Sequence, residues 1–332
     1  PVVGHLGDPD KGDLPAILAV NWILDTLVVL QGNGSEVLFE FGGVFGLSGA
    51  AIGDVDADGE PDIVAILDDG FVTMYDNTGV QNWISEAPVS YRIAVPIIVD
   101  LDRNGSTEVV VDTVVLNGAD GSVMRRYTAP QTLNRAMVVA DIDLDGLDEI
   151  FLGEIMYDLD EEPVQFDVMS TYLFVAVANL DDDPEGEFVS VKPGQIRFFQ
   201  HDGSIFKTKP LPGSIAAPPA IADFDGDGAP EIAVPTGEYL ALVDTDGELL
   251  WETPVNDPSC CAGCSAYDFD ADGDYEIIYA DQEHLYIIDG SDGTVLSKYE
   301  SHTSGTWLEY PVIADVDGDD QVEIVIVSNL QG

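Results

Sequence analysis

Basic residues are scarce in this chain. Of its 332 residues, 11 are Lys or Arg and 63 are Asp or Glu, which gives a formal net charge of −52. Nucleic acids and anionic membrane surfaces are bound through basic patches, so we expect neither as a partner. A surface whose charges are mostly negative resists aggregation, and salt screens the repulsion between those charges. The composition therefore suits a saline environment.

Long apolar runs and a leader segment are also missing. No apolar stretch approaches the ~20 residues of a membrane-spanning helix, so we expect no membrane insertion. No basic-then-apolar signal segment opens the chain, which begins at Pro1 without Met. We therefore expect a processed product or a fragment of a longer chain.

Cysteine and histidine are too few to define a site. Cys260, Cys261 and Cys264 form one Cys-Cys-Ala-Gly-Cys stretch, with no second CxxC and no βαβ context. We favour one local disulfide with one thiol left over, and keep buried inert thiols and a metal or intermolecular link as alternatives. The four histidines fall in different parts of the chain and form no metal-ligand spacing.

Acidic residues, in contrast, follow a strict pattern. In residues 222–234, Asp223, Asp225 and Asp227 alternate with other residues, Gly228 follows, and Glu231 precedes an apolar run. A 12-residue calcium loop uses positions 1, 3, 5, 7 and 9 as ligands and a glycine at position 6 for its sharp turn. Position 12 is Val234, where an EF-hand has Glu. The stretch therefore predicts a calcium loop that leads into a strand.

This loop recurs along the whole chain. Its first position is Asp54, Asp100, Asp141, Asn179, Asp223, Asp268 or Asp315, at spacings of 46, 41, 38, 44, 45 and 47 residues. An eighth copy near Gly7 has lost its ligands. A period of 40–50 residues with strand-like segments is typical of propeller blades.

Each of the seven loops supplies oxygen ligands at the same five positions, with a backbone carbonyl at the seventh. We expect about six to seven calcium ions, bound for structural reasons. The expected metal ligands are Asp54, Asp56, Asp58, Glu60 and Asp62; Asp100, Asp102, Asn104, Ser106 and Glu108; Asp141, Asp143, Asp145, Leu147 and Glu149; Asn179, Asp181, Asp183, Glu185 and Glu187; Asp223, Asp225, Asp227, Ala229 and Glu231; Asp268, Asp270, Asp272, Asp274 and Glu276; and Asp315, Asp317, Asp319, Gln321 and Glu323.

Two loops depart from the pattern at position 6. Pro184 and Asp320 replace the glycine there, so we expect both loops to turn differently. The first of them also begins with Asn179, which offers a neutral ligand.

The segments around each loop predict four strands. An apolar segment such as 97–99 precedes the loop, and an apolar run such as 63–66 follows it, as expected for strands buried on both faces. A third segment such as 285–288 leads through an Asp-Gly turn to a more polar fourth segment, 295–299. We predict an all-β propeller of four-stranded antiparallel blades.

The repeat count favours eight blades, the last one incomplete. We expect one domain over residues 1–332, with repeats that start near residues 1, 48, 93, 136, 172, 215, 260 and 307. The alternative is seven blades and an extra hairpin. An incomplete blade exposes a strand edge, which we expect a neighbouring subunit or further chain to pair with.

The repeat resembles the FG-GAP/VCBS family, the calcium-loop β-propellers that include the integrin alpha-subunit head. The resemblance rests on Asp54-Val-Asp56-Ala-Asp58-Gly59-Glu-Pro-Asp62, on Asp268-Phe-Asp270-Ala-Asp272-Gly273-Asp-Tyr-Glu276, and on Ala216-Ala217-Pro218 before Asp223. It implies an extracellular protein for recognition, adhesion or glycan binding, with a protein or glycan ligand at the cell surface. No Arg-Gly-Asp motif and no inserted domain is present, so integrin-like ligand binding does not transfer.

We therefore expect an extracellular, calcium-stabilised binding, adhesion or structural module of a larger surface protein or assembly. One alternative is a lectin-like propeller, in which Trp22, Trp83, Trp251 or Trp307 stack on sugars instead of packing between blades. A second alternative is a polysaccharide lyase scaffold. Lyases that act on anionic polysaccharides need basic residues, which are rare here, so we expect no enzyme activity.

Overall fold

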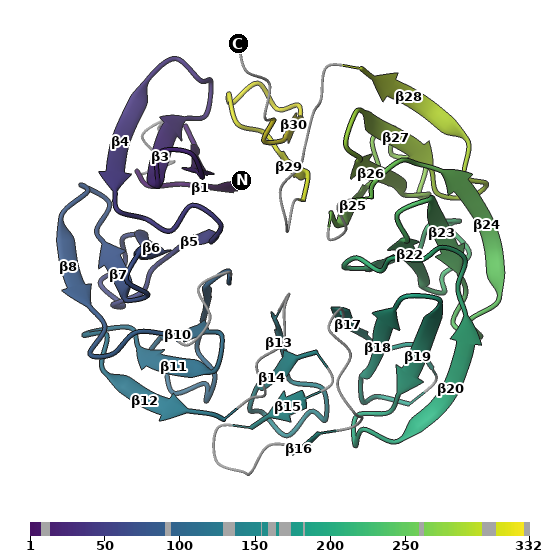
Figure 1. Ribbon diagram of the computed structural model, residues 1–332, viewed down its shortest axis with the longest axis horizontal. Coiled ribbons are helices and arrows are strands. Elements are labelled where there is room, and N and C mark those ends of the chain that lie inside the picture. The colour runs from purple at the N-terminus through teal and green to yellow at the C-terminus, as the bar shows by residue number, and fades with distance from the viewer. Residues whose placement is uncertain are drawn as a thin grey trace. The chain divides into compact units, whose positions relative to one another are not determined.

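The computed structural model describes residues 1–7, 14–89, 94–128, 137–153, 155–158, 164–165, 174–181, 183–258, 262–300 and 310–328. These residues form thirty β-strands, labelled in Figure 1, and no helix. Accordingly, no helix among them is long and apolar enough to cross a membrane. The strands belong to seven four-stranded sheets and one two-stranded sheet, all antiparallel.

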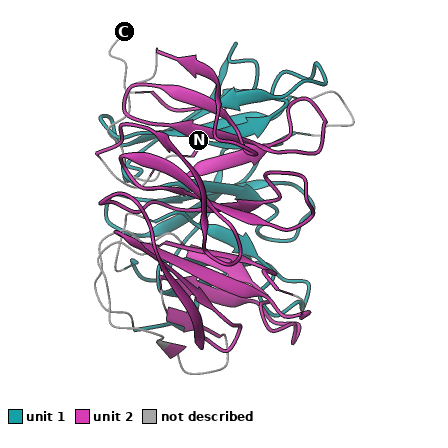
Figure 2. Cartoon of the chain, turned by 90° about the vertical axis from the view of Figure 1, so that its right-hand side faces the viewer, with its two compact units in different colours: residues 1–131, 312–325 teal, residues 132–311, 326–332 magenta. Residues whose placement is uncertain are grey.

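The chain divides into two compact units, coloured separately in Figure 2. Unit 1 comprises Pro1–Gln131 and Val312–Val325, and unit 2 comprises Thr132–Pro311 and Ile326–Gly332. The strands of unit 1 are β1 (Val2–Gly4), β2 (Ala16–Asn21), β3 (Thr26–Gln31), β4 (Val37–Gly42), β5 (Ala50–Gly53), β6 (Asp62–Ile66), β7 (Val72–Tyr75), β8 (Gln81–Ile84), β9 (Ile97–Val99), β10 (Glu108–Val111), β11 (Val114–Asn117), β12 (Val123–Arg126), β29 (Val312–Ala314) and β30 (Glu323–Val325).

Unit 2 contains four further sheets of the same order. Their strands are β13 (Met137–Ala140), β14 (Glu149–Leu152), β15 (Ile155–Tyr157), β16 (Val164–Gln165), β17 (Phe174–Ala178), β18 (Glu187–Lys192), β19 (Gln195–Phe199), β20 (Ile205–Pro210), β21 (Ala220–Ala222), β22 (Glu231–Pro235), β23 (Tyr239–Val243), β24 (Leu249–Pro254), β25 (Cys264–Tyr267), β26 (Glu276–Ala280), β27 (Leu285–Asp289) and β28 (Val295–Tyr299). That residues 1–332 form one domain stays a prediction.

Consecutive strands are neighbours in every sheet, and the first strands of successive sheets contact each other within each unit, as β1 contacts β5 and β5 contacts β9. The second strands carry the apolar runs: β6, β10, β14, β22 and β26 are buried at every residue. The fourth strands are largely exposed, as in β4 and β28. This radial repetition of antiparallel sheets is a β-propeller, which confirms the predicted fold class.

Fourth-strand side chains fasten neighbouring sheets together. The ring of Trp83 on β8 lies against Gly121 in the β11–β12 hairpin, and its Nε1 donates a hydrogen bond to the Gly118 carbonyl at 2.7 Å. Trp251 on β24 repeats the arrangement in unit 2, where its Nε1 donates to the Gly290 carbonyl at 2.8 Å. Both tryptophans therefore pack between blades.

The hairpin β29–β30 lies beside the first sheet of unit 1. β29 contacts β1 (Figure 1). The carbonyl of Val316 lies directly against Gly32 in the β3–β4 hairpin. The carbonyl of Val55, between β5 and β6 of the second sheet, makes the same contact with Gly118 of the third sheet. Because β29–β30 repeats a contact made between complete blades, it supports the interpretation as the inner half of an eighth blade.

We expect Gly121→Ala to destabilise the chain by about 1–3 kcal/mol more than Gly34→Ala, the typical cost of overpacking. Both glycines have left-handed backbones, with φ +69° and +67°. A Cβ at Gly121 would lie 2.5 Å from Trp83 Cε3, whereas no described atom lies within 4 Å of that position at Gly34. Thermal unfolding of the two variants measures the difference, and equal losses would contradict the packing role given to Trp83.

Candidate metal centres

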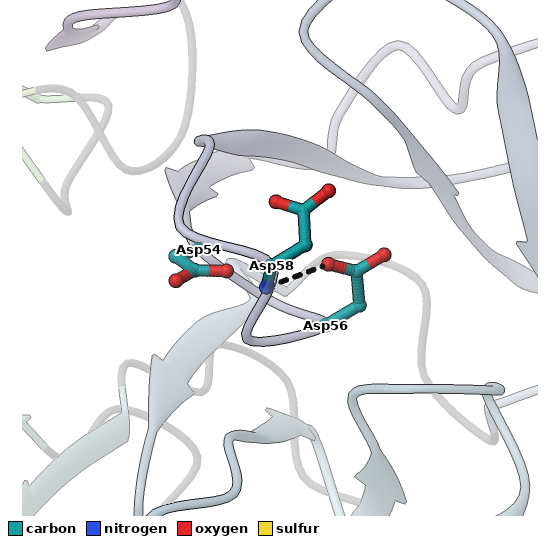
Figure 3. Close-up of side chains that lie close together, drawn as sticks. All are labelled: Asp54, Asp56 and Asp58. Atoms are coloured by element: carbon teal, nitrogen blue, oxygen red, sulfur yellow. Dashed lines mark hydrogen bonds between the residues drawn. The ribbon is translucent and has the colours of Figure 1, made fainter.

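The seven acidic loops join the first strand of a sheet to the second. In five of them, carboxylate oxygens from three residues lie within 4.8 Å of one another, and two more acidic groups have the same property. Two oxygens that share a cation at 2.3–2.6 Å lie at most about 5 Å apart, so this spacing suits a metal ion. Figure 3 shows Asp54, Asp56 and Asp58 around one loop. The other four groups are Asp100, Asp102 and Glu108; Asp141, Asp143 and Glu149; Asp181, Asp183 and Glu187; and Asp223, Asp225 and Glu231.

The acid at position 9 is fixed by the backbone in every loop. It opens the second strand, and one of its oxygens accepts a hydrogen bond from the N–H at position 2. In the Asp223 loop, Glu231 Oε2 accepts from Phe224 N at 2.8 Å. The equivalent bonds join Val55 to Asp62, Leu101 to Glu108, Ile142 to Glu149, Leu180 to Glu187, Phe269 to Glu276 and Val316 to Glu323, at 2.7–2.9 Å.

Two ligand oxygens are buried without a partner. Glu187 Oε1 and Asp223 Oδ1 are inaccessible to solvent and accept no hydrogen bond from any described residue. An unsatisfied buried oxygen is costly, and more so when it carries charge. A bound cation satisfies it. The donor set therefore fits a metal ion in the loops that begin at Asn179 and Asp223.

Backbone amides hold the remaining ligand side chains in place. The oxygen at position 3 accepts from the N–H at position 5, as Asp56 Oδ1 does from Asp58 N at 3.2 Å (Figure 3). The oxygen at position 5 accepts from the N–H at position 7, as Asp227 Oδ1 does from Ala229 N at 2.8 Å. These short-range bonds preorganise the carboxylates before any ion arrives.

The two loops without glycine at position 6 behave differently from each other. Asp320 adopts the left-handed φ of +66°, and its N–H donates to Asp315 Oδ2 at 2.9 Å. Gly228 makes the same bond to Asp223 Oδ2 at 3.0 Å, so the expectation that the Asp320 loop turns differently is wrong. Aspartate tolerates this backbone region better than most residues. Pro184 has no N–H to donate.

The Asn179 loop is closed by a side chain instead. Asn179 Nδ2 donates to the Asp183 carbonyl at 2.7 Å. This bond ties position 1 to position 5 of the loop, where Pro184 prevents the usual bond from position 6. The different closure expected from the sequence is therefore present in this loop, and it leaves the amide oxygen of Asn179 for a ligand.

Burial makes the position-9 carboxylates costly to ionise. Burial, together with the smaller effect of the neighbouring loop aspartates, raises the pKa of Glu149 and of Glu231 to about 7 and that of Asp62 to about 6. The pKa values of Glu108, Glu187 and Glu276 are raised for the same reasons. A divalent cation removes this penalty because it neutralises the clustered charges.

We expect the metal-free chain to gain thermal stability when the pH falls from about 7.5 to about 5.5. Carboxylates whose folded pKa is raised bind more protons in the folded chain than in the unfolded chain, so stability rises as pH falls through about 7 toward the unfolded value. Thermal unfolding of chelator-treated protein at the two pH values tests the sign. A lower melting temperature at the lower pH would contradict it.

At position 7 the loops have only the backbone in common, because their side chains differ. Leu147 and Ala229 have no side-chain oxygen, and the carboxylate of Glu60 instead accepts from Asn77 Nδ2 at 3.1 Å. The backbone carbonyl expected as the ligand at this position stays a prediction. Asn77 lies in the β7–β8 hairpin, and it orients a loop side chain from outside the loop.

Two more such residues escaped the sequence analysis. Gln200 Nε2 donates to Asp181 Oδ2 at 3.2 Å, and Thr107 Oγ1 donates to the Asp54 carbonyl at 3.2 Å from the next sheet. Gln200 belongs to the β19–β20 hairpin, which the motif does not include, and Thr107 stands at position 8 of the neighbouring Asp100 loop, to which the motif assigns no role. A single sequence carries no signal that pairs either residue with the loop it contacts.

Cys264 is a free, buried thiol at the start of β25. Burial raises its pKa to about 12, so it is protonated and inert. Any local disulfide therefore excludes Cys264, and Cys260 and Cys261 lie outside the described residues.

Of the tryptophans considered as sugar-stacking residues, Trp307 lies outside the described residues, and Trp22 is 50% exposed at the β2–β3 turn.

Comparisons with known proteins agree with this geometry. The FG-GAP-like repeat family matches residues 268–326. The Vibrio cholerae biofilm matrix protein Bap1 superposes with a TM-score of 0.82 at 16% identity, over 99% of this chain and 84% of that one. Rhamnogalacturonan lyase YesW superposes with a TM-score of 0.67 at 17% identity, over 98% of this chain and 69% of that one. The Bacillus licheniformis rhamnogalacturonan lyase PL11 superposes with a TM-score of 0.66 at 18% identity, over 98% of this chain and 69% of that one. No curated protein matches by sequence.

The fold and its loops define a class, that of β-propellers whose blades carry acidic loops able to hold metal ions. Within that class, residues 268–326 match the FG-GAP-like repeat family, and the other acidic loops show the same hydrogen bond from position 2 to position 9.

Proposed function

We propose that the chain is a calcium-stabilised β-propeller that acts outside the cell as a binding, adhesion or structural module of a larger surface protein or assembly. The observation that carries the proposal is the shared loop geometry, in which a backbone N–H fixes the position-9 acid of all seven described loops. The likeness to a biofilm matrix protein supports the location.

Calcium is the cation that suits these ligands. The expected donors are all oxygens, without a histidine or cysteine that would favour zinc or copper. Calcium accepts six to eight oxygens in flexible geometry, whereas magnesium requires a strict octahedron. The role is structural, since each ion ties the first two strands of a sheet together.

Asp225→Ala tests this assignment within one sheet. We expect the variant to bind one calcium ion fewer and to lose a few degrees of melting temperature in saturating calcium, because damage in a repeat fold stays mostly local. Glu252→Ala is the matched control, since it removes the same charge from exposed β24 in the same sheet. An unchanged ion count, or global unfolding of Asp225→Ala in calcium, would contradict the assignment.

A lectin-like role has one specific observation in its favour. Trp22, Ile23 and Leu24 are 50%, 65% and 65% exposed at the β2–β3 turn. Exposed aromatic rings stack on sugars and on apolar protein surfaces. If the ligand is a glycan, Trp22→Ala abolishes binding on a glycan array while Asp225→Ala in calcium does not. Equal binding by both variants would remove this turn from the ligand site.

We propose that the chain has no enzyme activity of its own, although two structural neighbours are lyases. Basic side chains suited to an anionic polysaccharide are few, and two of the lysines are engaged: Lys207 pairs with Asp246 at 2.7 Å and Lys209 with Glu248. Incubation with rhamnogalacturonan should release no unsaturated product. Release that survives purification of the calcium-loaded protein would overturn this part of the proposal.

A further inference from the structure

The acidic loops of neighbouring sheets contact each other through the residue at position 8. In unit 1, Thr107 Oγ1 at position 8 of one loop donates a hydrogen bond to the Asp54 carbonyl at position 1 of the loop before it, at 3.2 Å. In unit 2, Gly186 N donates in the same way to the Ile142 carbonyl at position 2, at 2.7 Å. Position 8 directly precedes the position-9 acid, so these contacts join the ligand residues of two loops through the backbone.

The loops that begin at Asp223 and Asp268 are joined at the same place. They belong to the sheets β21–β24 and β25–β28 of unit 2, in which β21 contacts β25. Gly290 in the β27–β28 hairpin lies against two carbonyls, that of Phe224 at position 2 of the first loop and that of Tyr275 at position 8 of the second. The two loops therefore meet beside one hairpin.

An acidic side chain crosses this contact. Asp274 stands at position 7 of the second loop, and its Oδ1 occupies the space that a Cβ of Gly226 would fill in the first loop. Gly226 is position 4 there, between the expected ligands Asp225 and Asp227. At position 7 of another loop, in contrast, Glu60 turns to the hairpin of its own sheet. The carboxylate of Asp274 thus reaches the metal centre of the neighbouring sheet.

The first loop has room for this carboxylate because its position 4 is glycine. Ala57, Leu144 and Ala271 hold the same position in other loops, with left-handed φ values of 59–61°. Gly226 has a similar φ of +69°. The backbone of the loop therefore accepts a side chain at position 4, and what excludes one at Gly226 is Asp274.

The charge on Asp274 makes the contact sensitive to calcium. Burial, and after it the carboxylates of Asp272, Asp225, Asp289 and Asp223, raise the pKa of Asp274. An ion bound in the first loop replaces part of this repulsion with attraction. Asp274 is then held against the first loop, and with it the segment that leads to the position-9 acid of its own loop. The first ion therefore preorganises the second site.

We propose that Asp274 couples the Asp223 and Asp268 loops, so that calcium bound in either loop raises the affinity of the other. Asp274 acts as a positioning residue between two metal centres, a role that the loop motif does not assign. The inference rests on the proposed calcium binding and adds its regulation. Coupling between two sites is reciprocal and typically changes affinity by about 5–150-fold. Asp274 is half-buried, and solvent screens its charge, so we expect about fivefold.

Two glycine amides report the two sites separately. Gly228 N donates to Asp223 Oδ2 at 3.0 Å, and Gly273 N donates to Asp268 Oδ2 at 3.1 Å, each at position 1 of its own loop. Their NMR resonances, followed while calcium is added to chelator-treated protein, give one calcium midpoint for each loop.

Asp274→Asn tests whether the side chain serves the neighbouring loop. We expect it to raise the Gly228 midpoint about fivefold, although it changes no residue of the Asp223 loop. Asp292→Asn is the matched control, since it removes the same charge from an exposed hairpin of the same sheet and keeps an acceptor for Thr294 N. The inference is overturned if Asp274→Asn moves only the Gly273 midpoint, or moves the Gly228 midpoint no further than Asp292→Asn does.

Gly226→Ala tests the same contact from the other loop. Its methyl group displaces Asp274, so we expect a similar shift of the Gly228 midpoint, and no further shift when Gly226→Ala and Asp274→Asn are combined. Shifts that add in the double variant would overturn the inference, because the two residues would then act separately. If neither glycine resonance responds to calcium, the loops bind none, and the proposed function fails together with the coupling.

Discussion

Removal of calcium should lower the melting temperature of this protein by about 10 °C or more. An ion that binds only the folded chain stabilises it by RT ln(1 + [L]/Kd), about 2.7 kcal/mol at a hundredfold excess over Kd. Three such ions together contribute about 8 kcal/mol, and each kcal/mol shifts the melting temperature of a domain this size by about 1–3 °C. Seven loops have the required geometry in the described residues.

Thermal unfolding with EDTA and with millimolar calcium measures this shift. Magnesium at the same concentration is the control for ionic strength, since screening alone acts on all 63 acidic residues whichever cation is present. Calcium added back should restore the higher melting temperature. A melting curve that EDTA leaves unchanged, once the removal of metal has been verified, would show that the loops are solvated acidic turns.

The second prediction with a large expected effect concerns Glu231, whose substitution should change the stability of the fold in opposite directions with and without calcium. We expect Glu231→Gln to be less stable than the wild type in calcium but more stable than the wild type without it, at about pH 8. Glutamine keeps an acceptor for the Phe224 N–H and removes a charge. Burial raises the pKa of Glu231 to about 7, so its ionised form destabilises the metal-free fold above that pH. The ion, in contrast, needs the carboxylate.

Glu231→Ala separates the charge from the hydrogen bond. Alanine leaves the buried N–H of Phe224 without an acceptor, which costs about 1–3 kcal/mol with or without calcium. We therefore expect Glu231→Ala to be less stable than Glu231→Gln by about this amount in both conditions, since the two variants remove the same charge and differ in the acceptor for the Phe224 N–H. If both variants lose the same stability in both conditions, Glu231 holds the loop to its strand and binds no ion.

The sequence predicted the repeating parts of the structure because each repeat carries its own local signal. Alternate aspartates ahead of Gly228 specify a turn by short-range hydrogen bonds, and the apolar run after Glu231 specifies a buried strand. Seven copies in phase then fix the strand order. The predicted eighth, incomplete blade appears as β29 and β30 for the same reason.

The contacts between repeats were beyond this reasoning. Trp83 reaches Gly118 and Gly121 across the interface between two sheets, and nothing in the spacing of the residues specifies that contact. The turn at Asp320 was predicted wrongly because a glycine rule was applied to a residue that also tolerates a left-handed backbone.

The central claim is that the repeated loops are calcium sites. It is tested most directly by counting the ions bound per chain, by native mass spectrometry after equilibration in millimolar calcium with excess ion removed. The account predicts about six to seven calcium ions per chain, one for each loop that has oxygens fixed by the backbone. A count of one ion or none would contradict it.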